Sequence, residues 1–417
     1  MGKRIVIIGG GIIGLCSAYY LQKEGHEVTI LDKSNMNAGA SYVNAGYITP
    51  SHIIPLASPG MISKGIRYMF NARSPFYMKP RLDLDFLKWA WYFKKSSTKE
   101  KVEKAIPLIK DINILSRELF HDIKSSGDLG IFHLERKGLL MLYQTHAEGD
   151  HELEIAEKAK FLGLEVNHLD KQGIKKIEPN VSINAVGAVH YECDGHTTPN
   201  EFMEKMIDHL LRKGVRICKN EEVIAISSSD QKIDSLQTNL GNYRADEVVF
   251  AAGSWTSSLA KKLQISLPIE AGKGYRINVQ EPTGITMPAI LMEAKVAVTP
   301  MTGFTRFAGT MEFSGINNTI RRERVDTIAE NASKFYEGLE ITNDNKAEAA
   351  CGLRPVTPDG LPYIGKSSNY KNLVIATGHA MMGWSLGPIT GKLVTQLISN
   401  SKTELDIGAL SPERKFI

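Results

Sequence analysis

The feature that most constrains this chain is a glycine-rich turn between an apolar strand and a helix near its N-terminus. The run KRIVIIG suits a short, buried parallel strand, and Gly9, Gly11 and Gly14 follow it in G-x-G-x-x-G spacing. The segment IIGLCSAYYLQKEG then has helical spacing and stops at Gly25. The run HEVTILD has the pattern of a second strand and ends on Asp32. Together these pieces predict a strand–helix–strand unit with parallel strands.

This unit predicts a Rossmann-like dinucleotide site. Its glycines let the backbone approach a pyrophosphate, the helix N-terminus offers free N–H groups, and Asp32 can accept hydrogen bonds from ribose hydroxyls. The alternative is a tight turn of the same shape with no ligand, and the combination of strand, helix and acidic residue favours the dinucleotide. The motif does not distinguish FAD from NAD, because both contain the ADP half that it binds.

Composition excludes several classes of protein. Of 417 residues, 42% are apolar and 23% charged, which is typical of a folded globular chain. The net charge of +4 gives no basis for nucleic-acid binding. The four cysteines form no C-x-x-C pair, which favours reduced thiols in the cytoplasm and predicts no metal site. Glycines in the N-terminal apolar run argue against a secretory signal, and no run is long enough to span a bilayer.

Changes of periodicity divide the chain into two interleaved parts. Helix–strand alternation returns at the amphipathic segment TTPNEFMEKMIDHLLRKG, and runs such as YRINV, KVAVTP and FTRFAGT read as a separate, mostly antiparallel sheet. We therefore expect an α/β cofactor domain built from discontinuous segments, 1–52, 195–262 and 345–417. An inserted α+β domain flanked by helices, residues 53–194 and 263–344, is expected to bind the substrate.

Aromatic and basic residues are interleaved over residues 66–95. A helix is expected over 84–95, and its apolar side chains at i, i+3 and i+7 are Phe86, Trp89 and Phe93. One interpretation is a core helix with a solvated basic face. The other is a peripheral patch that rests on anionic lipid, with Trp91 and Tyr92 at the interface.

A second constrained segment is AACGLRPVTPDGLPYIG, residues 349–365. Three prolines and three glycines surround one cation, Arg354. A planar guanidinium can bind a carboxylate through two parallel hydrogen bonds, so a rigid loop around Arg354 suits a ligand with a carboxylate. An ion pair with Asp359 is the structural alternative.

Several segments together resemble one known family. They are IVIIGGGIIGLCSAYYLQKEGHEVTILDK, NAGYITPS, LASPG, LKWAW, GKGY, AAGSWT, GLRPVTPDGLPYIG and NLVIATGHAMMGWSLG. The chain resembles the FAD-dependent D-amino-acid oxidase and glycine oxidase superfamily, and within it the small-subunit type of D-amino acid dehydrogenase. It departs from that family at Ala380, where glycine or serine is frequent, and in the residues before GKGY.

The resemblance implies that the cofactor is FAD and implies a set of residues that bind it. These are Gly9, Gly11, Ile12, Gly14, Asp32, Lys33, Ser41, Asn44, Ala45, Gly46, Val223, Ala252, Gly253, Gly378, His379, Ala380, Met382, Gly383, Trp384 and Ser385. The segment from Gly378 to Ser385 would place a helix N-terminus at the pyrimidine edge of the flavin, where the backbone N–H groups stabilise negative charge.

The resemblance also implies the chemistry. Arg354 would bind the carboxylate of a D-amino acid while a hydride passes from Cα to flavin N5. Tyr275 would be a second carboxylate ligand or, as the alternative, a half-buried strand tyrosine. The product would be an imino acid that hydrolyses to a 2-oxo acid and ammonia, or a cyclic imine if the substrate is a proline, and proton loss to solvent needs no obligate base. Lys273 would approach the flavin or be an ordinary turn lysine, His379 would contact flavin or backbone, and His52 would lie at the pocket mouth.

Several alternatives remain open at this point. The substrate could be D-proline, a hydroxylated D-proline or D-alanine, with electrons passed to a quinone or another carrier. A glycine- or sarcosine-type oxidase is a second interpretation, and a non-catalytic FAD-binding subunit is a third. The expected location is cytoplasmic, with peripheral contact at the inner face of the membrane if residues 66–95 touch lipid.

Overall fold

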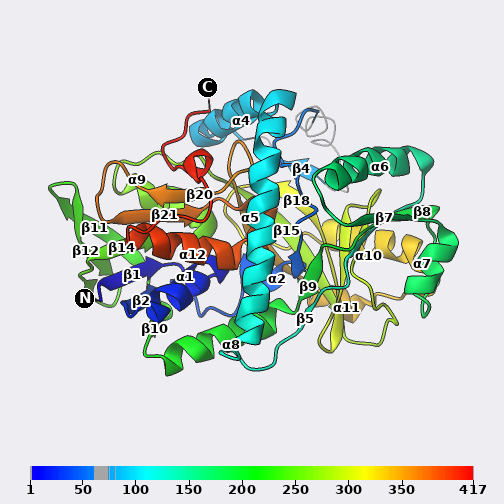
Figure 1. Ribbon diagram of the computed structural model, residues 1–417, viewed down its shortest axis with the longest axis horizontal. Helices are drawn as coiled ribbons and strands as arrows, with labels where there is room; N and C mark the ends of the chain where they lie inside the picture. The colour runs from blue at the N-terminus through cyan, green and yellow to red at the C-terminus, as the bar shows by residue number, and fades with distance from the viewer. Residues whose placement is uncertain (1, 61–73, 75, 80, 417) are drawn as a thin grey trace.

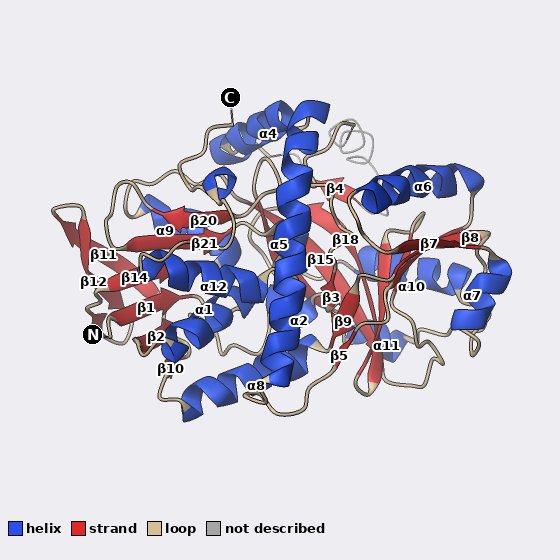
Figure 2. Cartoon of the chain, viewed as in Figure 1, coloured by secondary structure: helices blue, strands red, loops and turns tan. Residues whose placement is uncertain are grey.

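Two large β-sheets lie side by side, with helices packed around and between them (Figures 1 and 2). The computed structural model describes residues 2–60, 74, 76–79 and 81–416. Figure 1 shows the N-terminal strands in the left-hand sheet together with strands from the C-terminal part of the chain. Segments distant in sequence therefore build one sheet.

The left-hand sheet has six strands. In order across the sheet they are β10 (Arg216–Cys218), β2 (Glu27–Leu31), β1 (Arg4–Ile8), β14 (Glu247–Phe250), β21 (Leu373–Thr377) and β20 (Tyr363–Lys366). All neighbours are parallel except β20 and β21. The helices α1 (Ile12–Lys23) and α12 (Gly387–Ile398) pack closely, since a Cβ at Gly391 would lie 2.4 Å from the backbone of Cys16. The predicted Rossmann-like sheet is confirmed.

The right-hand sheet is mostly antiparallel, as predicted. Its strands, in order, are β19 (Ala350–Val356), β15 (Glu270–Val279), β18 (Phe304–Phe313), β17 (Val296–Met301), β16 (Ala289–Leu291), β6 (Leu139–Tyr143), β8 (Gly187–Tyr191) and β7 (Val166–Leu169), with β4 (Phe76–Met78) beside β18. Among the described strands of this sheet, only the pairs β16–β6 and β18–β4 are parallel. The helix α10 (Arg322–Phe335) covers one face through buried Val325, Ile328 and Phe335.

Two small sheets complete the β structure. One contains β3 (Tyr47–Ile48), β9 (Gly195–Thr197) and β5 (Leu134–Glu135), and the other β11 (Val223–Ser229), β12 (Lys232–Thr238) and β13 (Asn242–Tyr243). The remaining helical elements are α2 (Ala40–Val43), α4 (Leu84–Ser96), α5 (Lys99–Ser125), α6 (His146–Phe161), α7 (Lys171–Ile177), α8 (Pro199–Arg212), α9 (Thr256–Lys261), α11 (Asn343–Ala347), and the 3-10 turns η1 (Gly253–Trp255), η2 (Ala380–Met382) and η3 (Gly408–Leu410).

The long helix α5 crosses the front of the molecule between the two sheets (Figure 1). Thr98 caps its N-terminus by accepting a hydrogen bond from the backbone N–H of Lys101. Its buried residues Ile109 and Leu119 share an apolar cluster with Leu393 of α12. This helix therefore packs onto the C-terminal helix of the six-stranded sheet. The boundaries given above for the cofactor domain and the inserted domain stay a prediction.

The helix α4 confirms the helix predicted over residues 84–95. Asp83 caps the N-terminus of this helix. The helix side chains Phe86, Trp89 and Phe93 are buried, as the core interpretation requires. The opposite face exposes Trp91. Residues 66–73, 75 and 80 of the predicted aromatic-basic segment lie outside the described residues. Within the described part of the chain, no helix is long and apolar enough to cross a membrane.

Candidate active site

The glycine-rich turn after β1 has no room for side chains at Gly9 and Gly14. A Cβ at Gly14 would lie 1.9 Å from the carbonyl oxygen of Gly9, and one at Gly9 would lie 2.4 Å from the carbonyl oxygen of Ala251. Gly9 also has φ +112°, which favours glycine. The first turn of α1 contains no acidic residue, so the positive end of the helix is free to face a pyrophosphate.

The predicted ADP-binding residues meet at the carboxyl edge of the six-stranded sheet. The Asp32 carboxylate accepts hydrogen bonds from the backbone N–H of Gly10 at 2.7 Å and of Ser34 at 2.8 Å. The Lys33 ammonium lies 4.2 Å from the ring centroid of Trp255, within the turn that begins at Gly253. Ala252 precedes this turn. Val223 begins β11, and two residues before it the N–H of Glu221 donates to the Asp32 carbonyl.

A second predicted group surrounds α2. Ser41 accepts a hydrogen bond from the N–H of Ile12 at 3.0 Å, which joins α2 to the start of α1. Asn44 accepts from the N–H of Gly46 at 2.7 Å, and Gly46 has φ +73°. The turn from Asn44 through Ala45 to Gly46 is therefore held by its own side chain and by a glycine that the backbone requires.

Sequence reasoning missed the residues that fix this turn from the other sheet. Arg306 is fully buried and donates through Nη1 to the carbonyl oxygens of Tyr42 and Asn44, at 2.9 and 2.7 Å. Thr299 donates to the Ala45 carbonyl at 2.7 Å. Burial lowers the pKa of Arg306 to about 9, so the guanidinium stays charged at neutral pH. A lone arginine within the strand-like run FTRFAGT was the signal available in the sequence.

The third predicted group lies between β21 and α12. Gly378 has φ +79°, and Ala380 has φ +48°, in the region that favours glycine. His379 is buried beside the Thr390 hydroxyl at 2.9 Å, and burial lowers its pKa to about 3, so the imidazole is neutral. Ser385 accepts from the N–H of Thr49 at 3.1 Å. The remaining members are Met382, Gly383 and Trp384, whose indole N–H donates to Thr197 at 2.9 Å.

Arg354 lies on β19 and does not pair with Asp359. Its Nη1 donates to the carbonyl oxygen of Thr310 at 2.8 Å, whereas Asp359 forms a bidentate pair with Arg414 at 2.7 and 2.9 Å. The structural alternative for Arg354 is therefore wrong. No carboxylate in residues 2–60, 74, 76–79 and 81–416 forms an ion pair with the half-buried Arg354. Burial lowers its pKa to about 10, which still leaves it charged at neutral pH.

Two backbone features make room for the guanidinium. A Cβ at Gly274 would lie 2.4 Å from Cζ of Arg354, so only glycine leaves this space free. Opposite Gly274, the register of β18 shifts, and Thr310 at this irregularity has φ +65°. A β-branched residue at positive φ is strained, and here it directs its carbonyl toward Arg354.

Tyr275 and Lys273 lie on the opposite face of β15 from Arg354. In the register of β15 and β19, Arg354 pairs with Gly272, so it shares a face with the even-numbered residues of β15. The Tyr275 hydroxyl donates to Glu312 at 2.8 Å, and burial raises the tyrosine pKa. The Lys273 ammonium is 3.2 Å from the same carboxylate. This geometry supports neither Tyr275 as a second carboxylate ligand nor Lys273 beside the flavin.

Strand β19 joins Arg354 to the cofactor groups. A Cβ at Gly352, two residues before Arg354, would lie 2.4 Å from Val43 in α2. Val356, two residues after it, forms a backbone bridge with His379. The three predicted cofactor groups and Arg354 are thus connected through direct contacts. His52 is next to Ser51, and burial lowers the pKa of His52 to about 4.

Comparison with known proteins defines the class. The family described as "DAO: FAD dependent oxidoreductase" matches residues 4–397, and the chain belongs to this family. FAD is accordingly its cofactor. That the glycine turn, Asp32 and the Asn44–Gly46 turn hold it stays a prediction.

Individual relatives are similar over their full length. The chain is 31% identical to a D-amino acid dehydrogenase of Bradyrhizobium diazoefficiens, covering 99% of this chain and 98% of the relative. It is 28% identical to a D-amino acid dehydrogenase of Helicobacter pylori, covering 97% of each. Glycine oxidase from Geobacillus kaustophilus has the same fold, with a TM-score of 0.80, 23% identity and 99% coverage of both chains. L-proline dehydrogenase from P. horikoshii has a TM-score of 0.76 at 21% identity, covering 99% of this chain and 97% of that one.

Proposed function

We propose that this chain is an FAD-dependent dehydrogenase that oxidises a D-amino acid to an imino acid. The observation that carries the proposal is Arg354, a half-buried cation beside the cofactor groups that no described carboxylate neutralises. An α-amino acid brings the carboxylate that such a guanidinium binds in a bidentate manner. The full-length similarity to D-amino acid dehydrogenases supports the D configuration.

In this proposal the chain acts by binding and orientation. Arg354 holds the substrate carboxylate, and its bond to the Thr310 carbonyl, with Gly274 beneath it, restricts where the guanidinium can move. When bound, FAD supplies the hydride acceptor for the substrate Cα–H. The amine loses a proton to solvent, and water converts the imine of a primary amine to a 2-oxo acid and ammonia, whereas a D-proline substrate would give a cyclic imine. Burial lowers the pKa of His379 to about 3, so its imidazole is too weakly basic to take up a proton near neutral pH, and the proposal assigns it no role as a base.

The experiment is anaerobic reduction of the FAD-loaded enzyme. D-Amino acids, including D-proline, hydroxy-D-proline and D-alanine, are added separately from their L-enantiomers, glycine and sarcosine, and the flavin absorbance is followed. Rapid bleaching by D-amino acids alone supports the proposal and identifies the preferred side chain. Bleaching by glycine or sarcosine instead moves the enzyme to the amine-oxidase alternative. An enzyme that none of these compounds reduces does not use Arg354 as proposed.

We further propose that electrons leave to a membrane quinone, with the outer face of α4 resting on anionic lipid. The exposed apolar residues of this region are Leu82, Leu84, Leu87 and Trp91, and Lys94 and Lys95 follow on the same helix. The four unpaired cysteines favour a reducing, cytoplasmic compartment.

Vesicle flotation tests this surface. Binding to vesicles with anionic lipid should fall in the double variant Leu84→Ser, Trp91→Ser. It should persist in Leu240→Ser, which removes an exposed leucine from the turn between β12 and β13. If the wild-type protein stays with the unbound fraction at low salt, α4 is not a lipid-binding surface.

A further inference from the structure

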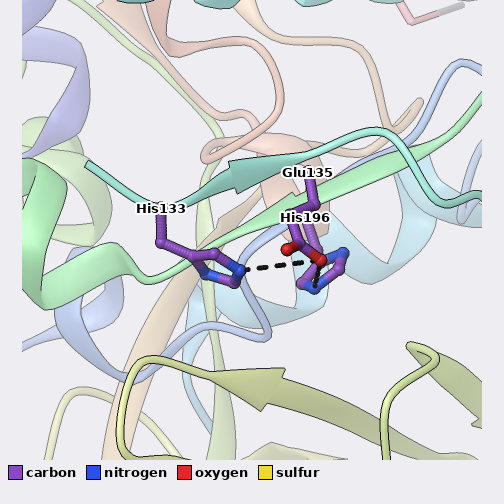
Figure 3. A group of neighbouring side chains, drawn as sticks. All are labelled: His133, Glu135 and His196. Atoms are coloured by element: carbon purple, nitrogen blue, oxygen red, sulfur yellow. Dashed lines mark ion pairs between the residues drawn. The ribbon is translucent and has the colours of Figure 1, made fainter. Parts of the chain in front are cut away.

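Three potential metal ligands converge on the small sheet that contains β3, β9 and β5. Glu135 on β5 lies directly opposite His196 on β9, and His133 is two residues before Glu135. Residues opposite one another, and residues two apart on an extended chain, share a face. Figure 3 shows the three side chains pointing toward one another, and their potential ligand atoms all lie within 4.8 Å of each other.

The buried histidine of this cluster has no hydrogen-bond partner. His196 is fully buried, and neither its Nδ1 nor its Nε2 is hydrogen-bonded to any described group. Its Nε2 lies 3.8 Å from Oε2 of Glu135, and Nε2 of His133 lies 3.9 Å from the same oxygen. Buried polar atoms in folded proteins are nearly always bonded, so a missing ligand explains His196 better than the protein alone does.

We propose that His133, Glu135 and His196 bind a divalent transition-metal ion of the Zn²⁺ type. Two imidazole nitrogens and one carboxylate oxygen are ligands that Zn²⁺ prefers, whereas Ca²⁺ and Mg²⁺ require mainly oxygen. Tetrahedral ligands at about 2.0–2.1 Å from Zn²⁺ are roughly 3.4 Å apart. For most pairs of ligand atoms, the separation therefore needs to shorten by about 1 Å or less, which small rotations of the side chains provide.

The surroundings of the cluster match those of metal sites. Nδ1 of His133 lies 2.8 Å from the Thr198 hydroxyl, which orients the ring so that Nε2 faces the cluster. Glu135 is partly exposed, which leaves an entry path for an ion. One group competes: the Lys137 ammonium is 2.7 Å from Oε2 of Glu135 and must move away when the ion binds.

The position of the site links it to the cofactor turn. Thr197, next to His196, donates through its backbone N–H to the Gly46 carbonyl at 2.8 Å and accepts from the Trp384 indole at 2.9 Å. A bound ion would join β5 to β9 at this point. We therefore expect it to stabilise the strand that holds the Asn44–Gly46 turn, without taking part in the reaction.

The test is a Zn²⁺ titration of the FAD-loaded enzyme after chelator treatment, with affinity measured by competition against a chromophoric chelator. The wild-type enzyme should bind one Zn²⁺ per chain at this site, and its thermal midpoint should rise with Zn²⁺. Glu135→Gln and His133→Gln should each weaken binding at least tenfold. Lys137→Met should tighten it, because the competing ammonium is gone. His196 stays unchanged in every variant, since replacing so buried a side chain endangers the fold.

The chain offers a matched control in His26, which lies 3.9 Å from Glu24 and belongs to no cluster of three potential metal ligands among the described residues. The variant His26→Gln should bind Zn²⁺ as the wild type does. Wild-type protein that binds no stoichiometric Zn²⁺ would overturn the proposal. So would Glu135→Gln and His133→Gln variants that bind it with wild-type affinity.

Discussion

Cations lie on both faces of the nine-stranded sheet, and the two faces use them differently. On one face Arg354 donates to a backbone carbonyl and has no described acidic partner. On the other, Glu312 is surrounded by Lys273 at 3.2 Å, Arg324 at 3.1 Å and the Tyr275 hydroxyl at 2.8 Å. The first arrangement leaves a cation without an acidic partner, and the second pairs its cations with a carboxylate of the protein.

The difference follows from strand register. Lys273 and Gly274 are adjacent in sequence, yet Lys273 faces Glu312 while Gly274 lies beneath Arg354, because successive residues of a strand alternate between faces. The sequence GKGY alone therefore suggests a ligand-site lysine, whereas Lys273 is buried beside Glu312 in the protein core. What decides its role is the carboxylate on the facing strand.

The largest expected effect comes from removing the unpaired cation. Arg354→Leu should lower kcat/KM for the preferred D-amino acid about a thousandfold, roughly 4 kcal/mol, because the bound carboxylate loses its charged partner. Arg354→Lys should recover part of this loss, since it restores the charge without the planar fork. Steady-state kinetics with a soluble acceptor give both values. Unchanged FAD content would show that the loss is in substrate binding, and wild-type kinetics in Arg354→Leu would remove this residue from the site.

The paired face should respond in stability instead. Glu312→Gln leaves Lys273 and Arg324 buried without a counter-charge, and breaking such a group destabilises a protein by about 3 kcal/mol or more. Urea unfolding at pH 7 measures this. The folded fraction should keep the KM of the wild type, and a large rise in KM with little loss of stability would reverse the roles assigned to the two faces.

The same variant has a defined pH dependence. Burial alone would raise the pKa of Glu312, but hydrogen bonds from Ser314 and Tyr275 and the charge of Lys273 hold it below its usual value of 4.5. A carboxyl group of this kind stabilises the fold above pH 4.5 and loses that contribution as the pH falls through its folded pKa. The difference in unfolding free energy between wild type and Glu312→Gln should therefore shrink below pH 4.5.

Much of the fold was predictable because it depends on local patterns. The strand–turn–helix at Gly9–Gly14 and the helices at 84–95 and 199–212 follow from periodicity, glycine spacing and caps within a few residues. Arg306 was not predictable in this way. Its role depends on two carbonyl groups more than 260 residues away in sequence, which only the packing of the two sheets brings together.

The sequence also did not predict which face of the sheet each strand residue at the site occupies. Tyr275 and Arg354 were expected to share a carboxylate, but the pairing register of β15 with β19 assigns them to opposite faces. A one-residue shift of that register would have exchanged the faces. No pattern in GKGY or GLRPV specifies it, because both segments are short and rich in glycine. Long-range contacts such as that of Gly352 with α2 fix the register.

A smaller effect is expected from moving Arg354 without removing it. In Gly274→Ala the new Cβ would lie 2.4 Å from the guanidinium carbon, so the side chain must shift. KM for the D-amino acid should rise roughly tenfold or more, about 1.4 kcal/mol, with little change in stability. In the Arg354→Leu background the same substitution should have no further effect. Additive effects in that double variant would mean that Gly274 acts through something other than Arg354.

The smallest effect concerns strain on the Arg354 side of the sheet. Ala380 has φ +48° and packs in the same apolar cluster as Met311, beside Arg354. Ala380→Gly should relieve about 1 kcal/mol of backbone strain, and the extra freedom of glycine in the unfolded chain should offset part of that. We expect a net gain of about 0.5 kcal/mol in urea unfolding. As a control, Ala147→Gly on the exposed surface of α6 should lose a similar amount, because glycine weakens a helix. If Ala380→Gly instead destabilises the protein as Ala147→Gly does, the positive φ at Ala380 carries no strain, and the two faces of the sheet differ only in their charges.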